Sequence, residues 1–231
     1  MHNPDADAPF FNDIPPVVVA LAILLGAIEL VFQAGNAGII GGPGAINWRL
    51  GMAERFGFFN SAAQWMWQTG QFPLEHMQRF VTHVFFHRSG TDALFSIVFL
   101  LALGKFVGER VATWVLLVVF FGSTMLTALS QAMLFGPQML LLGAGAATYG
   151  LIGALTWLLF SHARAFGGDP RRAFALAGAL AVIHLVFYVI FGGNTWFESL
   201  AGFVFGFLLT MALCPWPGHG PGYWLDRTRD R

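Results

Sequence analysis

The segment Gly143-Ala-Gly-Ala-Ala-Thr-Tyr-Gly-Leu-Ile-Gly-Ala154 lies within an apolar run from about Met139 to Phe160. A run of this length can cross a bilayer as a helix. Small residues recur in it at helical spacing, on one side of the helix: Gly143, Ala146, Ala147, Gly150, Gly153 and Ala154. In lipid such a face lets other helices approach to backbone contact, so we expect this span at the centre of a bundle. The later segment Gly202-Phe-Val-Phe-Gly206 is expected to pack into the resulting groove.

The composition is that of an integral membrane protein. Of the 231 residues, 56% are hydrophobic and 10% are charged, whereas soluble domains contain about 25% charged residues. The formal net charge is zero, which gives no argument for a nucleic-acid partner. The single Cys214 cannot form an internal disulfide. Residues 1–13 contain acidic side chains but no Lys or Arg, so we expect no cleaved signal peptide.

The hydropathy pattern predicts an all-α membrane protein with six transmembrane helices in one domain, residues 14–214. Each of the six apolar segments is near the ~20 residues that a crossing requires: Ile14–Ala34, Phe80–Val107, Val111–Leu134, Met139–Phe160, Ala173–Phe191 and Thr195–Leu213. Eight of the 12 Lys and Arg residues fall on the side of the termini, which the positive-inside rule makes cytoplasmic. Residues 1–13 and 215–231 are then cytoplasmic segments, and a bacterial inner membrane is the expected location.

One long connection, residues 35–78, is predicted on the outer side of the membrane. It opens with a Gly-rich stretch and then mixes aromatic and charged residues from Trp48 to Phe72. This composition is typical of an interfacial segment that is half embedded in the bilayer. An ordinary extramembrane loop is the alternative.

The segment 143–154 resembles a motif of the rhomboid family, G-x-S-G-A-x-x-G-L-x-G-A, whose serine is the nucleophile of an intramembrane protease. In this chain the serine position is Gly145 and the glycine after it is Ala146. The start of the second apolar segment is also similar to the family, although Gln78 replaces the usual Trp. The matching positions there are Arg79, Thr82, His83 and His87. The resemblance implies a six-helix rhomboid-like bundle whose long first loop enters the outer leaflet.

The resemblance also locates the family's other active-site positions, and these have changed. Asp92 and Ser96 stand where active members carry a His and an Asn that stabilise the oxyanion, and Ser199 stands at the general base. Acyl transfer needs an oxygen nucleophile, a base and oxyanion donors. Gly145 has no side chain, Ser199 is not basic, and an ionised Asp92 would repel an oxyanion. Loss of one such group typically lowers the turnover rate by factors of ~10⁴ to 10⁶. The sequence therefore predicts no catalytic residues.

Two other chemistries remain open for the same residues. Two His and two carboxylates could bind zinc or iron, but the His positions also occur in ordinary rhomboids. We therefore expect no metal and no cofactor at His83, His87, Asp92 and Glu198. A relocated serine protease is the second alternative, in which Ser199 or Ser96 attacks and one of the two His residues acts as base.

Glu29 in the first apolar segment is the remaining ionisable group of interest. A charge at the bilayer centre costs ~2.5–3.5 kcal/mol on insertion scales, so we expect a polar partner or a position near the interface. The alternative is a transporter, in which Glu29, Asp92 and Glu198 line one polar path. His184 and Tyr188 are four residues apart and are interpreted as a buried hydrogen-bonding pair.

The function that the resemblance implies is binding without proteolysis. The inactive branches of the family, iRhoms and derlins, suggest that such a scaffold stabilises or escorts a membrane protein or a transmembrane helix of another subunit. The vacated site could hold a partner side chain, lipid or water in a cavity. Its expected lining is Gly145, Ala146, His83, His87, Asp92, Glu198 and Ser199.

Overall fold

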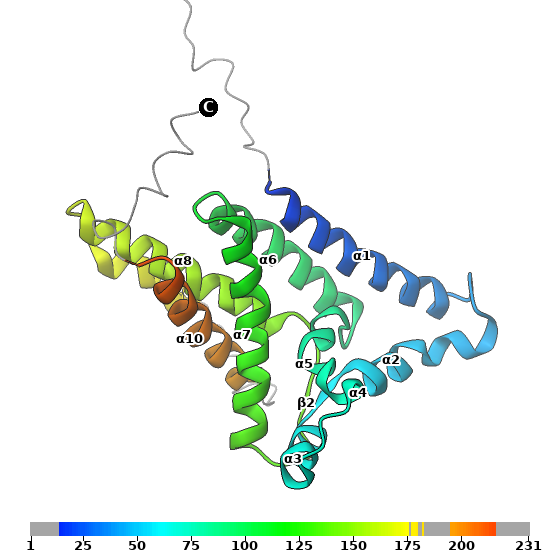
Figure 1. Cartoon of the computed structure of the whole chain (residues 1–231). Coiled ribbons are helices and arrows are strands. Elements are labelled where there is room, and N and C mark those ends of the chain that lie inside the picture. Colours follow the sequence, from blue (N-terminus) through cyan, green and yellow to red (C-terminus); the bar gives the residue numbers. More distant parts are fainter. Residues whose placement is uncertain (1–13, 176, 180–181, 183–194, 216–231) are drawn as a thin grey trace, which may run out of the picture.

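The fold is a bundle of long helices with several short elements at one end (Figure 1). The computed structural model describes residues 14–175, 177–179, 182 and 195–215. In chain order its elements are α1 Pro16–Asn36, η2 Gly42–Asn47, α2 Trp48–Phe56, β1 Phe58–Phe59, α3 Asn60–Thr69, α4 Leu74–Met77, α5 Arg79–Thr82, η3 His83–Phe85, α6 Gly90–Gly108, α7 Thr113–Leu134, β2 Leu140–Leu141, α8 Gly145–Ala165, η4 Pro170–Phe174 and α10 Thr195–Leu213.

Four helices in the described part of the chain are long and apolar enough to cross a membrane. They are α1, α6, α7 and the Trp196–Leu213 part of α10. Helix α8 has 21 residues, which at a rise of ~1.5 Å per residue also suffices for the ~30 Å hydrocarbon core. Its Gly, Thr and Tyr residues lower its hydropathy, and most of its side chains are buried against other helices. The chain is therefore an integral membrane protein whose central helix contacts protein more than lipid.

The second apolar segment is not one continuous helix, contrary to the prediction. The helix of α5 and η3 ends at Phe85, and α6 starts at Gly90 after a turn. Ser89 caps α6, because its Oγ accepts a hydrogen bond from the Asp92 backbone N–H at 3.2 Å. The Asp92 carboxylate in turn accepts one from the Arg88 N–H at 3.2 Å. His83 and His87 therefore do not share a helix face.

The fourth apolar segment begins with an extended stretch instead of a helix. Leu140–Leu141 forms β2, which pairs antiparallel with β1 in the register Phe58 with Leu141. Gly143 then has a φ of +101°, a left-handed conformation that L side chains rarely adopt. Gly143 thus lies before α8 and not on its small-residue face, where it was expected.

The predicted fifth span, Ala173–Phe191, is only partly described. Its start forms the end of η4, and most of the remainder lies outside the described residues, as do His184 and Tyr188. The count of six transmembrane helices therefore stays a prediction.

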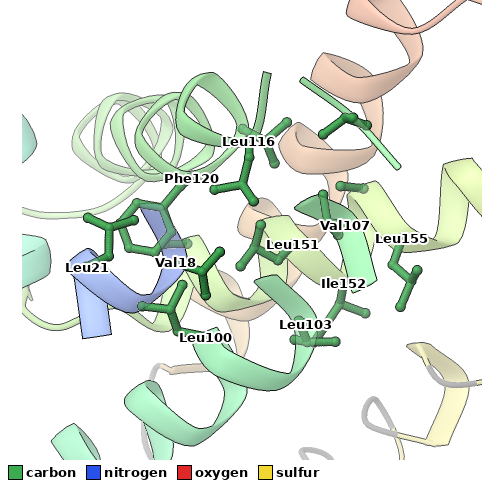
Figure 2. Close-up of a cluster of buried hydrophobic side chains, with 14 of the residues drawn as sticks. Val18, Leu21, Leu100, Leu103, Val107, Leu116, Phe120, Leu151, Ile152 and Leu155 are labelled. Atoms are coloured by element: carbon green, nitrogen blue, oxygen red, sulfur yellow. The ribbon is translucent and has the colours of Figure 1, made fainter. Parts of the chain in front are cut away.

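The hydrophobic core joins the first half of α1, the second half of α6, the first half of α7 and the middle of α8. Figure 2 shows side chains of these four helices pointing into one cluster. Glycines on α6 bring α1 close, because a Cβ on Gly104 would lie 2.8 Å from Val18 Cγ1. Moving such aliphatic side chains out of water stabilises a fold by roughly 25 cal/mol per Å². Moving them out of lipid gives no such gain, so in a bilayer these side chains stabilise the bundle mainly by close packing.

Helices α8 and α10 lie side by side (Figure 1) and make backbone contact. A Cβ on Gly206 would overlap the carbonyl oxygen of Gly150, and one on Gly202 would overlap that of Ala146. On α8, a Cβ on Gly153 would overlap the carbonyl oxygen of Phe203 in α10. The small residues thus allow a contact that any larger side chain would prevent.

The connection between α1 and α6 folds into short helices that gather at one end of the bundle (Figure 1). Buried polar contacts attach it there. The Asn60 side chain donates to the Gln131 carbonyl oxygen of α7 at 3.1 Å, and the Gln131 amide donates back to Asn60 Oδ1 at 3.1 Å. The Arg79 guanidinium donates to the Glu54 carbonyl oxygen at 2.8 Å. Whether this segment enters the bilayer stays a prediction.

Gly206→Ala tests the contact between α8 and α10. The added methyl meets backbone that cannot rotate away, so the free energy of unfolding should fall by about 1–3 kcal/mol, measured by thermal unfolding in detergent. The matched control is Gly51→Ala in α2, where a Cβ meets nothing within 4 Å. Equal stability of the two variants would contradict the packing described.

Candidate functional site

The start of α8 is tied to the turn that contains the two His residues. The Gly143 N–H donates to the carbonyl oxygen of His83 at 2.9 Å, and the Ala144 N–H donates to His87 Nε2 at 3.3 Å. A side chain on Gly143 would meet both the His87 ring at 3.2 Å and the Asp92 carboxylate at 3.3 Å. The loop before α8 therefore depends on glycine both for its conformation and for its fit.

The space above Gly145 is filled by Glu198 of α10. A Cβ on Gly145 would lie 2.5 Å from Glu198 Oε1. The Glu198 carboxylate accepts a hydrogen bond from the Ala146 backbone N–H, at the first turn of α8. It is 6% exposed and lies 3.9 Å from the Arg88 guanidinium. Free backbone N–H groups and the helix dipole favour a negative group at this position.

Two of the remaining polar residues near this position, Ser199 and Asp92, have structural partners. Ser199 is buried and is hydrogen-bonded with the Tyr149 side chain, one turn into α8. Asp92 binds backbone at the start of α6. Ser96 is buried one turn further along that helix. The structure thus brings Gly145, Ala146 and Glu198 into contact, while the Asp92 carboxylate accepts from the Arg88 N–H just before α6.

His83 is held as a neutral imidazole. Its Nδ1 lies 2.7 Å from the Arg79 carbonyl oxygen, which can only accept, so Nδ1 carries the proton. Its Nε2 is buried and has no hydrogen-bond partner in the described part of the chain. Complete burial lowers the pKa of His83 from 6.5 to about 4, against the opposing effect of the Arg79 hydrogen bond.

His87 lies between several charged groups. Its Nε2 accepts from Ala144, so the lone pair that a general base needs is already in use. Burial lowers the pKa of His87, while the neighbouring carboxylates of Asp92 and Glu29 act in the opposite direction. Its carbonyl oxygen accepts from the Arg49 guanidinium at 2.9 Å.

The alternatives of a metal site and a relocated nucleophile gain no geometric support. Within residues 14–175, 177–179, 182 and 195–215, no three His, Cys, Asp or Glu side chains gather in a way that could hold a metal ion. The acceptor nitrogen of His83 has no partner, and that of His87 faces a backbone N–H. Neither imidazole lone pair therefore receives a serine hydroxyl.

Glu29 has the polar partner that was expected of it. Its carboxylate accepts from Arg49 of α2 at 2.6 Å and 3.0 Å, and from Gln33 at 2.6 Å. The Arg49 guanidinium also lies 4.9 Å from the Phe32 ring centre. This bidentate pair joins α1 to the connecting segment, and each of Glu29 and Glu198 has its own Arg.

A family model described as Rhomboid domain matches residues 74–216, more than half of the chain. The chain belongs to the rhomboid family. No curated protein sequence matches it. The matched range contains the His83–His87 turn, α8 and α10, so the rhomboid scaffold surrounds the site, while α1 and most of the connecting segment precede the match.

Sequence reasoning missed two residues of this rhomboid site, Arg88 and Tyr149. Arg88 is the ion-pair partner of Glu198, and Tyr149 is bonded to Ser199. Glu198 itself gave a signal, because a carboxylate in an apolar helix is costly and needs a partner. Its position over Gly145 had no such signal, since it depends on how α10 is placed along α8.

The neutral His83 makes stability depend on pH. The pKa of His83 is about 4 in the folded protein and 6.5 when the side chain is exposed. Its contribution to the free energy of unfolding is therefore complete above pH 6.5 and is lost as the pH falls toward 4. At ~1.36 kcal/mol per pKa unit, the free energy of unfolding should fall by up to about 3 kcal/mol. Thermal unfolding from pH 7 to 4 measures this decrease.

His83→Gln should flatten that pH dependence, because Gln does not titrate. The matched control is His162→Gln at the exposed end of α8. This variant should leave the change of unfolding free energy with pH as it is in the wild-type chain. An unaltered slope in His83→Gln would show that another group is responsible.

Proposed function

We propose that this rhomboid is a pseudoprotease, which binds and stabilises or escorts a membrane-protein partner without peptide hydrolysis. The observation that supports this most is Glu198, whose carboxylate occupies the space above Gly145 where a nucleophile would stand. A substrate carbonyl placed there would meet a carboxylate instead of a hydroxyl.

The electrostatics at the start of α8 also argue against hydrolysis. An oxyanion needs free donors in a preorganised site. The Ala146 N–H already donates to the Glu198 carboxyl group, so it is not free to stabilise an oxyanion. The base position is Ser199, which is engaged with Tyr149. The Ala146 N–H, the Glu198 carboxyl group and Ser199 therefore already have partners within the chain.

A partner helix has an apolar surface available on α6. Leu94, Phe95, Val98 and Phe99 are exposed on this helix, which also carries the cap beside the vacated site. Transmembrane helices associate by van der Waals packing and interhelical hydrogen bonds. We propose that a transmembrane helix of another subunit packs here, in an inner membrane with both termini of this chain cytoplasmic.

Gly145→Ser alone should not create an enzyme. The new side chain would compete with Glu198 for the same space, and no base would be present. Fluorophosphonate labelling and cleavage of a transmembrane reporter should both stay at background. The triple variant Gly145→Ser, Glu198→Ala, Ser199→His supplies a hydroxyl, room and an imidazole, and should react with the probe.

Wild-type cleavage that disappears in Ser199→Ala or Ser96→Ala would overturn the assignment in favour of a relocated protease. Labelling of Gly145→Ser at the level of the triple variant would show that Glu198 does not occupy the site.

Partner binding is tested by a photo-crosslinking amino acid at Phe95 on α6. The expected result is one reproducible crosslinked membrane protein, identified by mass spectrometry after purification in mild detergent. The matched control is Val118 on α7, which is similarly exposed. The same products from both positions would contradict a specific surface on α6.

A further inference from the structure

A polar cleft lies in the connecting segment, apart from the vacated site. It has a volume of about 560 Å³, within the usual range for a bound small molecule. Residues of α2 line one side of the cleft, and residues from α4 to the start of α5 line the other. Its lining residues are Gly51, Glu54, Arg55, Glu75, Gln78 and Arg79.

The cleft carries two positive and two negative side chains. Arg79 is fixed, because its guanidinium donates to the backbone carbonyl oxygens of Glu54 at 2.8 Å and Gly57 at 3.1 Å. It lies 4.0 Å from Glu75, whose side chain is 70% exposed. The Arg55 guanidinium lies 5.4 Å from the Phe56 ring centre. The cleft therefore holds one positioned guanidinium, which is 10% exposed and forms an ion pair with Glu75, and a carboxylate on Glu75 that is largely open to a ligand.

Exposed apolar side chains lie on the same elements that line the cleft. Leu50 of α2 is 60% exposed, and Leu74 of α4 is 80% exposed. Met52 and Met77 are also exposed. In an integral membrane protein, such side chains beside a charged cleft indicate the boundary between acyl chains and headgroups.

We propose that this cleft binds the headgroup of a phospholipid that carries both a phosphate and a primary ammonium group, as phosphatidylethanolamine does. The phosphate is bound by Arg55 and Arg79, since guanidinium groups match phosphate oxygens. The ammonium is bound by Glu54 and Glu75. The acyl chains then lie along Leu50 and Leu74.

Charge complementarity selects this headgroup over others. A lipid with only a negative headgroup, such as phosphatidylglycerol, would use the two Arg residues and leave Glu54 and Glu75 opposing its charge. The site is independent of the vacated protease centre, so it goes beyond the proposed function and does not rest on it.

Native mass spectrometry of the full chain, titrated with each lipid in detergent, tests the proposal. Phosphatidylethanolamine should bind at least about tenfold more tightly than phosphatidylglycerol of the same acyl chains, as two charge-assisted contacts imply. Glu54→Gln with Glu75→Gln should remove this preference. Arg55→Gln should weaken binding of both lipids, whereas the control Arg110→Gln, outside the cleft, should change neither.

Three results would overturn the proposal. The first is equal binding of the two lipids to the wild-type chain, and the second is cleft variants that behave like Arg110→Gln. The third is equally tight binding of soluble glycerophosphoethanolamine, which would show that a free headgroup and not a lipid is recognised. Thermal unfolding of each variant establishes that it is folded, and Arg79 is left unchanged because it supports the backbone.

Discussion

The rest of the structure depends on the backbone contact between α8 and α10. A Cβ at Gly206 would overlap Gly150, and one at Gly202 would overlap Ala146, so the observed register depends on glycine at both positions. In a bilayer, where apolar burial provides little drive between helices, such close packing is the main source of affinity. The register in turn determines which α10 side chain reaches the start of α8. That side chain is Glu198, and its carboxylate lies over Gly145.

The polar end of the bundle follows from the same constraint. Once Glu198 is placed at the first turn of α8, a cation becomes favourable beside it, and Arg88 lies at 3.9 Å. The turn that carries Arg88 is itself fixed by the Ser89 cap and by the bonds from Gly143 and Ala144 to the His83–His87 turn. A scaffold that serves hydrolysis in active rhomboids is here closed by internal ion pairs and hydrogen bonds. The proposal of a binding role without hydrolysis rests on this arrangement.

Much of the fold could be predicted from local patterns in the sequence. Long apolar runs gave α1, α7 and α10 within a few residues, because a helix in lipid must satisfy its own backbone. The break before α6 was missed, although Ser89 followed by Asp92 three residues later is a capping signal. The pairing of Phe58 with Leu141 could not be predicted, since short strands distant in sequence leave no periodic signal. For the site, the glycine at the family's serine position, Gly145, could be read from the sequence. The position of Glu198 over it could not, because that depends on how α10 is placed along α8.

A double-mutant cycle between Gly145→Ala and Glu198→Ala tests whether the Glu198 side chain lies over Gly145. If the Glu198 carboxylate fills the space above Gly145, then Gly145→Ala should lower the free energy of unfolding by about 1–2 kcal/mol in the wild-type background and have little effect once Glu198 is Ala. Thermal unfolding of the four proteins in one detergent gives the coupling energy. If Gly145→Ala lowers the free energy of unfolding by the same amount in both backgrounds, the two residues are not in contact, and Glu198 does not fill the space above Gly145.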